Sequence, residues 1–387
     1  MTNLTSWMAS VPDSTPLTRM SIPGTHESGA RFCAVISGDW AQCQNQEFTI
    51  TRQLNAGVRY LDVRLRNFQN TLQVHHEAVY QKARFQDVVD ECVTFLHSHS
   101  SETILMRIKH EYHNNDEGDD STDAGFVARF NDISGQHPGL FHAGSSVPRL
   151  RDVRGKIVVL SDVDTLPGIN WNGSLMDKQD DWNPDNSSVK VEEAKKQFEK
   201  ARNDSTSSSL FVNHLSCYRK IPDGSPAEMA KVVVPPVREY LWASIATSGW
   251  NALGTVPMDY VDENQAPMVI DHLIWWNSVG TAGQTRTLTI EQAEMLTFND
   301  GSTDPEVFGS IVITTHDKRI SAWNRNKDNR VKFPHSKGTF KLDADNATSN
   351  RGFSIQVDLW DYDTWNPNDQ VALGVVYWAP AGRFQVQ

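Results

Sequence analysis

The chain has 387 residues, of which 39% are hydrophobic and 22% charged, so it can bury the core of a large domain and of a smaller second one. Its formal net charge of -12 disfavours nonspecific nucleic-acid binding as the main function, because such binding depends on a basic surface, and it disfavours strong attraction to anionic membranes. No apolar run reaches the roughly 18 residues that a transmembrane helix requires.

Short runs of β-branched and apolar residues alternate with longer helix-like stretches through the first three quarters of the chain. The expected strands are Arg19–Ile22, Val58–Arg64, Leu72–Val74, Thr103–Ile108, Lys156–Leu160, Leu210–Asn213 and Thr255–Tyr260. The expected helices are Phe85–Ser98, Val191–Arg202 and Pro226–Ser248. Repeated alternation of strands and helices predicts a parallel α/β sheet, and roughly 280 residues of it fit closure into a barrel.

The pattern changes near Gly301, where short alternating segments follow one another between clusters of Asn, Asp, Gly and Pro. The expected strands here are Gly309–Thr314, Gly338–Leu342, Phe353–Leu359 and Val371–Trp378. This pattern is typical of an antiparallel β-sandwich. We therefore expect an α/β barrel domain over residues 1–300 and a small all-β sandwich-like domain over residues 301–387, with the boundary within Phe298–Pro305.

A histidine follows a Pro-Gly turn in the segment Ser21–Ser28, which reads SIPGTHES. The carboxylate of Glu27 beside His26 can fix the tautomer of the imidazole and raise its basicity, which suits a general base. A loop histidine that only caps a turn explains this local sequence equally well. The segment alone therefore leaves both interpretations open.

Charged residues alternate along the expected strand that begins at Val58. The strand period of two places Tyr60, Asp62, Arg64 and Arg66 on one face. Charges on the inward face of a barrel strand must be paired, so Asp62 beside Arg64 indicates a site that handles an anion. The alternative is an edge strand whose polar face meets solvent.

Two adjacent histidines end the next expected strand. Because neighbouring strand residues point to opposite sides, only one of His75 and His76 can serve a given site. A zinc site would want histidines at i, i+4 on a helix or a Cys-x-x-Cys pair, and neither is found with these histidines. Cys33 and Cys43 could close a small loop or remain free thiols.

In this order, SIPGTHES, GVRYLDVRL, HHEAVY and ETILMRIKHEY resemble the catalytic core of bacterial-type, metal-independent phosphatidylinositol-specific phospholipase C. RGKIVVL, QDDW, LFVNHLS and LGTVPMDYV extend the resemblance over roughly residues 5–280. The combination is specific, although no single motif is. The resemblance implies a distorted, partly open TIM-like β/α barrel, which agrees with the alternation of strands and helices.

The resemblance also implies roles for five residues. His26 is expected to act as the general base and His76 as the general acid, cleaving an inositol phospholipid into diacylglycerol and inositol 1,2-cyclic phosphate. Asp62 is expected to orient a catalytic group, and Asp259 to orient His26 and support its imidazolium. Arg64 stands where metal-dependent relatives carry an acidic ligand for Ca²⁺, so its guanidinium is expected to replace the metal, with no cofactor required.

Four residues are expected to contact the headgroup. By the resemblance, Lys109 and Asp180 hydrogen-bond inositol hydroxyls, and Trp182 supplies the aromatic surface on which the sugar ring stacks. Glu27 replaces a commoner aspartate. RGKIVVL is followed by Ser-Asp, where an inositol-binding arginine is expected. These departures leave the headgroup open between plain, phosphorylated and glycosylated inositol.

A cluster of acidic residues lies in the expected C-terminal domain. The spacing of Asp361, Asp363 and Asp369 resembles a Ca²⁺-binding loop of calcium-dependent membrane-binding β-sandwich domains. An ordinary Asx-rich turn is the alternative. The sequence thus predicts no metal in the barrel and leaves a Ca²⁺ site in the second domain open.

Two other functions stay open at this point. A metal-dependent glycerophosphodiester or sphingomyelin hydrolase would need a Glu-x-Asp metal pair, which the strand with Asp62 and Arg64 lacks. A non-catalytic lipid- or sugar-binding relative would not need the full set of histidines, carboxylates and arginine. We expect a peripheral protein that meets inositol phospholipid at a membrane surface and binds no nucleic acid. We also expect secretion, with a signal peptide removed before this numbering, rather than a cytoplasmic location.

Overall fold

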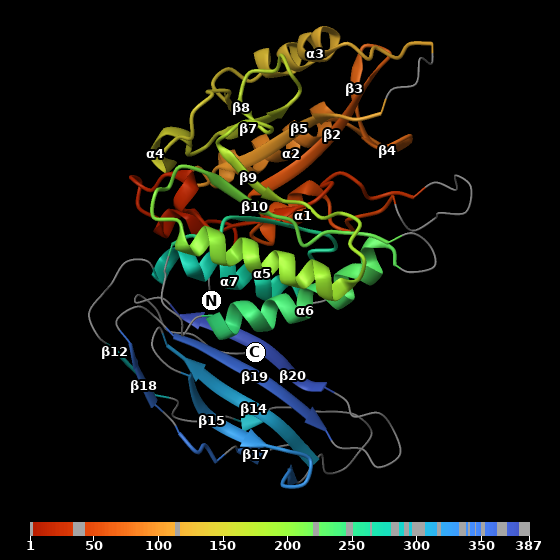
Figure 1. Cartoon of the computed structure of the whole chain (residues 1–387). Coiled ribbons are helices and arrows are strands. Elements are labelled where there is room, and N and C mark those ends of the chain that lie inside the picture. The colour runs from red at the N-terminus through yellow and green to blue at the C-terminus, as the bar shows by residue number, and fades with distance from the viewer. Residues whose placement is uncertain are drawn as a thin grey trace. The chain divides into compact units, whose positions relative to one another are not determined.

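The computed structural model describes most of the chain (Figure 1). The described residues are 3–33, 43–112, 117–219, 224–244, 251–263, 265–279, 286–289, 294–295, 306–315, 319–332, 338–339, 341–344, 346–349, 353–361 and 370–378. Contacts divide the chain into two compact units. The first comprises residues 3–240 and 249–277, and the second comprises residues 1–2, 241–248 and 278–387. The boundary expected within Phe298–Pro305 lies outside the described residues and stays a prediction.

An eleven-stranded sheet forms the centre of the first unit. Eight of its strands lie side by side in parallel, in the order β6 (Phe141–His142), β7 (Ile157–Asp162), β5 (Ile104–His110), β2 (Tyr60–Phe68), β1 (Ile22–Thr25), β11 (Thr255–Met258), β10 (Leu210–Asn213) and β9 (Met176–Gln179). An antiparallel ribbon of β3 (Thr71–His76) and β4 (Val79–Arg84) extends β2, and β8 (Ile169–Asn170) pairs with β7. The sheet curls into a distorted, partly open TIM-like barrel, which confirms the expected α/β fold.

Helices pack around this sheet (Figure 1). They are α1 (Ile50–Asn55), α2 (Phe85–Ser98), α3 (Asp123–Gly135), α4 (Leu150–Val153), α5 (Ser187–Asn203), α6 (Pro226–Ser244), α7 (Ala266–Val279) and two 3₁₀ turns at Trp7–Ser10 and Leu17–Arg19. Contacts place α5 on β9 and β10, and α2 on β3 and β4. The bounds of α2 and the first residue of α6 are those expected from the sequence. No described helix is both long and apolar enough to cross a bilayer.

The period of the sequence explains how α2 forms and which face it buries. Its buried residues recur three or four positions apart and form one apolar stripe. They are Phe85, Val88, Val89, Cys92, Phe95 and Leu96. The carboxylate of Asp87 accepts from the backbone N–H of Arg84 at 2.7 Å and so closes the first turn. Each large apolar side chain that is buried in this way stabilises the fold by roughly 1.5–3 kcal/mol.

Strand β1 lies three residues later than the strand expected at Arg19–Ile22. Local rules assign Pro23 and Gly24 to a turn, but both pair with β11 inside the parallel sheet. Gly24 is required here because a Cβ atom would lie 2.7 Å from Cδ1 of Tyr60 on the neighbouring strand. Partners distant in the sequence therefore fix the strand that leads into His26.

A buried ion pair ties the start of the chain to the amino-terminal end of the barrel. Nη2 of Arg59 lies 2.8 Å from Oε2 of Glu102, and both side chains are 0% exposed. Arg59 also donates to the carbonyl of Thr5, and Glu102 accepts from the N–H of Met8. Because an unpaired buried charge is costly, these contacts hold the first residues against the barrel.

The second unit is antiparallel β, as expected. Its largest sheet has the order β15 (Arg319–Arg325), β14 (Glu306–Thr314), β19 (Phe353–Asp361) and β20 (Gln370–Trp378), with β16 (Val331–Lys332) beside β14. Two further pairs join β12 (Arg286–Thr289) to β18 (Asn346–Ser349) and β13 (Glu294–Met295) to β17 (Gly338–Thr339). Ala347 of β18 shares one apolar core with residues of β14, β15 and β19, so the pair β12–β18 contacts the larger sheet. Asp361 ends β19, whereas Asp363 and Asp369 lie outside the described residues.

Candidate active site

A pocket of about 530 Å³ opens where the carboxyl ends of the parallel strands meet. Eight of the nine barrel residues expected to serve the site line this pocket. They are His26, Glu27, Arg64, His76, Lys109, Asp180, Trp182 and Asp259. The ninth, Asp62, is fully buried against Arg64. Residues from distant parts of the sequence thus converge at the end of the barrel where such folds place their sites.

His26 lies beside Asp259 because β1 and β11 run parallel, with Thr25 opposite Met258. Nδ1 of His26 lies 3.0 Å from Oδ1 of Asp259, and the same oxygen accepts from Nδ2 of Asn45 at 3.0 Å. Burial disfavours the imidazolium, but the charge and hydrogen bond of Asp259 outweigh burial and raise the pKa of His26 above its ordinary value. Asp259 therefore holds the Nδ1 proton, and Nε2 remains as the basic atom.

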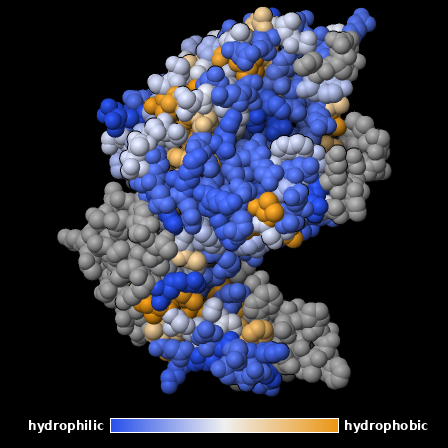
Figure 2. Space-filling model, viewed as in Figure 1, coloured by the Kyte–Doolittle hydropathy of each residue, from blue (hydrophilic) through white to orange (hydrophobic). Residues whose placement is uncertain are grey.

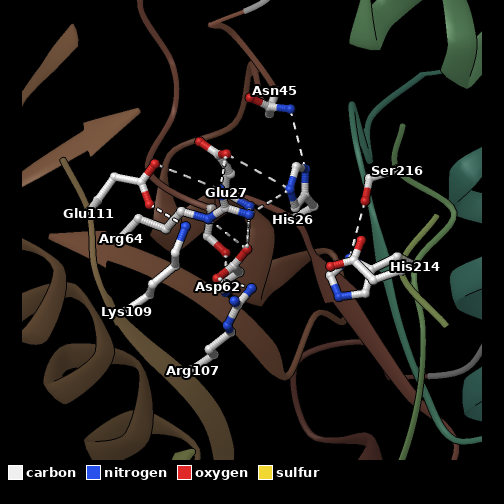
Figure 3. Close-up of polar contacts among 12 residues, drawn as sticks. His26, Glu27, Asn45, Asp62, Arg64, Arg107, Lys109, Glu111, His214 and Ser216 are labelled. Atoms are coloured by element: carbon white, nitrogen blue, oxygen red, sulfur yellow. Dashed lines mark hydrogen bonds and ion pairs between the residues drawn. The ribbon is translucent and has the colours of Figure 1, made fainter. Parts of the chain in front are cut away.

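Arg64 lies at the centre of the charged groups, as Figure 3 shows. Its Nη2 atom lies 2.9 Å from Nε2 of His26 and 3.2 Å from Oδ2 of Asp62. Its Nη1 atom lies 2.5 Å from Oε1 of Glu27. Burial opposes the charge of Asp62, yet Arg64 and Arg107 hold the pKa of that carboxyl well below its usual range. Asp62 therefore stays ionised and fixes the orientation of the Arg64 guanidinium.

His76 ends β3 and contacts the same carboxylate as Arg64. Nε2 of His76 lies 3.3 Å from Oε1 of Glu27, whereas His75, on the other side of the strand, is not among the pocket-lining residues. Glu27 reaches both groups from a left-handed backbone conformation, with a φ angle of 41°. The Glu27 carboxylate thus holds the His76 imidazole and the Arg64 guanidinium next to each other. Arg64 in turn contacts the imidazole of His26.

The remaining pocket residues suit a polyhydroxylated ring. Nζ of Lys109 lies 2.6 Å from Oε2 of Glu111. Trp182 is 55% exposed and stacks on Tyr218, with ring centroids 5.4 Å apart. Burial opposes the charge of Asp180, but nearby imidazoles and cations hold its pKa below the ordinary value. The ammonium group can donate hydrogen bonds to the hydroxyls of such a ring, and the carboxylate can accept hydrogen bonds from them. The exposed aromatic face can stack on the ring.

Four residues near the pocket were not singled out from the sequence, although three of them lie within the quoted motifs. They are Asn45, Arg107, Glu111 and His214. Arg107, Lys109 and Glu111 alternate along RIKHE, so the strand period of two was a signal that could have placed them on one face. Asn45 follows no local pattern of this kind. His214 is fully buried, which lowers its pKa to about 3.

Arginine and lysine side chains pair with the carboxylates of the pocket. Among the residues that the structure describes, no group of three or more His, Cys, Asp and Glu side chains is placed to hold a metal ion. Cys33 and Cys43 are not joined by a disulfide. Burial and a hydrogen bond with Cys43 raise the pKa of Cys33 to about 11.

The chain is similar to known phosphatidylinositol-specific phospholipases C in both sequence and fold. The X domain of phosphatidylinositol-specific phospholipase C matches residues 20–162. The chain is 30% identical over 239 residues to a 1-phosphatidylinositol phosphodiesterase of Staphylococcus aureus, covering 54% of this chain and 74% of that protein. It is 27% identical over 288 residues to the enzyme of the same name from Listeria monocytogenes, covering 68% and 83%. A solved structure of the phosphatidylinositol-specific phospholipase C from Listeria monocytogenes superposes with a TM-score of 0.61 at 26% identity, covering 71% of this chain and 98% of that one.

Proposed function

The chain is an enzyme that belongs to the bacterial-type phosphatidylinositol-specific phospholipase C family, and we propose that it cleaves inositol phospholipid at a membrane surface. The proposed products are diacylglycerol and inositol 1,2-cyclic phosphate. One observation carries the proposal: Arg64 lies between His26 and the Glu27 carboxylate, and that carboxylate also contacts His76. When a hydroxyl attacks a phosphodiester, a base must take the hydroxyl proton, an acid must protonate the leaving oxygen and a cation must stabilise the phosphate. Two imidazoles and a guanidinium at one site can do this.

The proposed reaction is an in-line displacement at phosphorus. Nε2 of His26 takes the proton of the inositol 2-hydroxyl as the hydroxyl oxygen forms its bond to phosphorus. The bond from phosphorus to the glyceride oxygen breaks, and Nε2 of His76 gives that oxygen a proton, so that diacylglycerol leaves as an alcohol. Proton exchange with water then returns both histidines to their starting states.

Arg64 is proposed to stabilise the phosphate oxygens in the transition state. A guanidinium presents parallel N–H donors that match two phosphate oxygens. Asp62 fixes the guanidinium in place before substrate arrives, so little reorganisation is needed during the reaction. Because Arg64 supplies the positive charge at phosphorus, we propose that cleavage requires no metal ion in the barrel.

Lys109 and Asp180 are proposed to bind ring hydroxyls, with the exposed indole of Trp182 covering one face of the ring. Glu27 also lines the pocket, where it contacts Arg64 and His76. The visible surface is mostly hydrophilic, and hydrophobic residues form small separate groups (Figure 2). On such a face the small apolar groups favour weak, reversible contact with lipid over deep insertion.

Phosphorus NMR of the products formed from phosphatidylinositol vesicles tests the proposal. We expect the signal of a five-membered cyclic phosphate, formed at a rate that excess chelator does not change. Phosphatidylcholine vesicles are the control, since their headgroup lacks the attacking hydroxyl and should yield no product. A linear inositol phosphate as the first product would contradict attack by the 2-hydroxyl. Loss of turnover in chelator would contradict the role proposed for Arg64.

A further inference from the structure

Arg107 lines the pocket, but the proposed reaction does not use it. It lies on β5, two positions before Lys109, so both side chains lie on one face of the strand. The side chain is 7% exposed, and it lines the pocket. Its guanidinium lies 4.4 Å from the centroid of the Trp171 ring, which restrains the plane of the group. Arg107 is therefore a nearly buried, restrained donor at the wall of the pocket.

The hydrogen bonds of Arg107 leave part of its guanidinium for a ligand. Nε and Nη2 donate to Oδ2 of Asp162 at 3.2 and 2.6 Å. Nη1 donates to Oδ1 of Asp62 at 3.3 Å. A guanidinium has five N–H groups, so Nη1 and Nη2 each keep one that no acceptor among the described residues engages.

The position of Arg107 separates it from the phosphate chemistry. Asp62 offers one oxygen to Arg64 and the other to Arg107, so the two guanidinium groups lie on different sides of one carboxylate (Figure 3). Arg64 contacts Nε2 of His26, whereas Arg107 contacts the end of β7 through Asp162. A phosphate bound between the histidines and Arg64 therefore leaves Arg107 for another part of the substrate.

The charges around Arg107 indicate which part of the substrate it contacts. The carboxylates of Asp62 and Asp162 both bind the guanidinium, and Asp180 lines the same pocket. The positive charge of Arg107 is thus offset by its own partners, which suits uncharged hydroxyl groups. Oδ1 of Asp162 in turn accepts from Nδ2 of Asn172 at 2.8 Å, which holds the carboxylate, and with it Arg107, in place.

We propose that Arg107 determines headgroup specificity by donating its two remaining N–H groups to neighbouring hydroxyl oxygens of the inositol ring. The identity of the ring rests on the proposed function. A site built to hydrogen-bond a hydroxyl discriminates strongly against a substrate that lacks it, because the buried donors are then left unpaired. Arg107 should therefore matter for a fully hydroxylated ring and not for a ring that carries only the attacking hydroxyl.

Arg107→Lys tests this proposal, because lysine keeps a positive charge beside Asp62 and Asp162 but loses the paired donors. Calorimetry with free myo-inositol measures ring binding without turnover. Rates with two soluble nitrophenyl phosphodiesters, one of inositol and one of 2-hydroxycyclohexanol, measure specificity. We expect inositol affinity and kcat/KM for the inositol substrate to fall roughly 10- to 100-fold. We expect kcat/KM for the hydroxycyclohexyl substrate to stay within about twofold.

The matched control is Arg66→Lys. Nε of Arg66 lies 2.9 Å from Oδ1 of Asp119, and Arg66 is not among the pocket-lining residues, so this variant should change neither substrate. Thermal unfolding checks that Arg107→Lys is folded. Equal losses on both substrates, or unchanged inositol affinity, would overturn the proposal, since Arg107 would then act only by holding Asp62. If the wild-type enzyme binds inositol but cleaves neither diester, the proposed function fails, and the change in inositol affinity still decides the role of Arg107.

Discussion

Nδ1 of His26 lies 3.0 Å from Oδ1 of Asp259, although 233 positions separate the two residues in the sequence. Parallel pairing of β1 with β11 brings them to neighbouring strand ends. Asp259 holds the Nδ1 proton and also outweighs the effect of burial on the pKa of His26. The proposed base and its carboxylate therefore act as one unit.

Replacement of Asp259 by asparagine tests this coupling. We expect Asp259→Asn to lower kcat by roughly 10²-fold or more, because an amide does not support the imidazolium. Burial then acts on His26 with less opposition, so the pKa of His26 falls and the acidic limb of kcat/KM moves to lower pH. Rates measured from about pH 4 to pH 9 check this shift. An unmoved acidic limb would mean that another group is the base. Asp177→Asn, which alters a carboxylate paired with Lys200, is the control and should leave the profile unchanged.

The effect of removing His76 should depend on the leaving group. The alkoxide of diacylglycerol is a poor leaving group and needs a proton, whereas nitrophenolate is a good leaving group and needs none. We expect His76→Ala to slow cleavage of phosphatidylinositol by roughly 10²- to 10⁴-fold and cleavage of nitrophenyl inositol phosphate by less than about tenfold. Initial rates with the two substrates make the comparison. His97→Ala, on the exposed side of α2, is the control. Equal slowing of both substrates would argue against His76 as the acid.

Charge and geometry can be separated at Arg64. Arg64→Lys keeps a cation beside Asp62 but loses the paired donors, so we expect kcat to fall roughly 10²- to 10³-fold with little change in stability. Arg64→Met leaves Asp62 with less compensation, and we expect it also to lower the free energy of unfolding by several kcal/mol. Turnover and urea unfolding of both variants test this. A lysine variant with a near-normal rate would show that charge alone is sufficient.

β7 and β9 show how the prediction of a strand depended on the apolar signal of its own residues. β7 reads as an apolar run because both of its faces are covered, and the expected strand Lys156–Leu160 overlaps it from Ile157 to Leu160. β9 reads MDKQ and ends the parallel array, so only part of it is buried and it carries little apolar signal. Its position depends on pairing with β10, which local sequence does not reveal.

The site residues divide in a similar way. The motif around His26 left two interpretations open by itself, and the order of the motifs that follow it gave the resemblance. The arginine expected after RGKIVVL is missing, and the structure instead places Asp162 there, bound to Arg107 of the neighbouring strand. That contact follows from the register of β5 against β7, in which Lys109 lies opposite Asp162. Neither strand alone predicts the register, so the contacts on which the proposed role of Arg107 rests are visible only in the folded chain.

The ion pair at the far end of the barrel should matter for stability and not for catalysis. Glu102→Gln leaves Arg59 buried without its counter-charge, so we expect the free energy of unfolding to fall by roughly 3–5 kcal/mol, with kcat of the folded enzyme unchanged. Urea unfolding and turnover under native conditions measure the two quantities. Asp13→Asn is the matched control, because Asp13 pairs with Arg154 at 2.7 Å but is 67% exposed, and its loss should cost less than about 1 kcal/mol. Equal, small losses in both variants would mean that the hydrogen bonds of Arg59 to backbone carbonyls are sufficient to stabilise its charge.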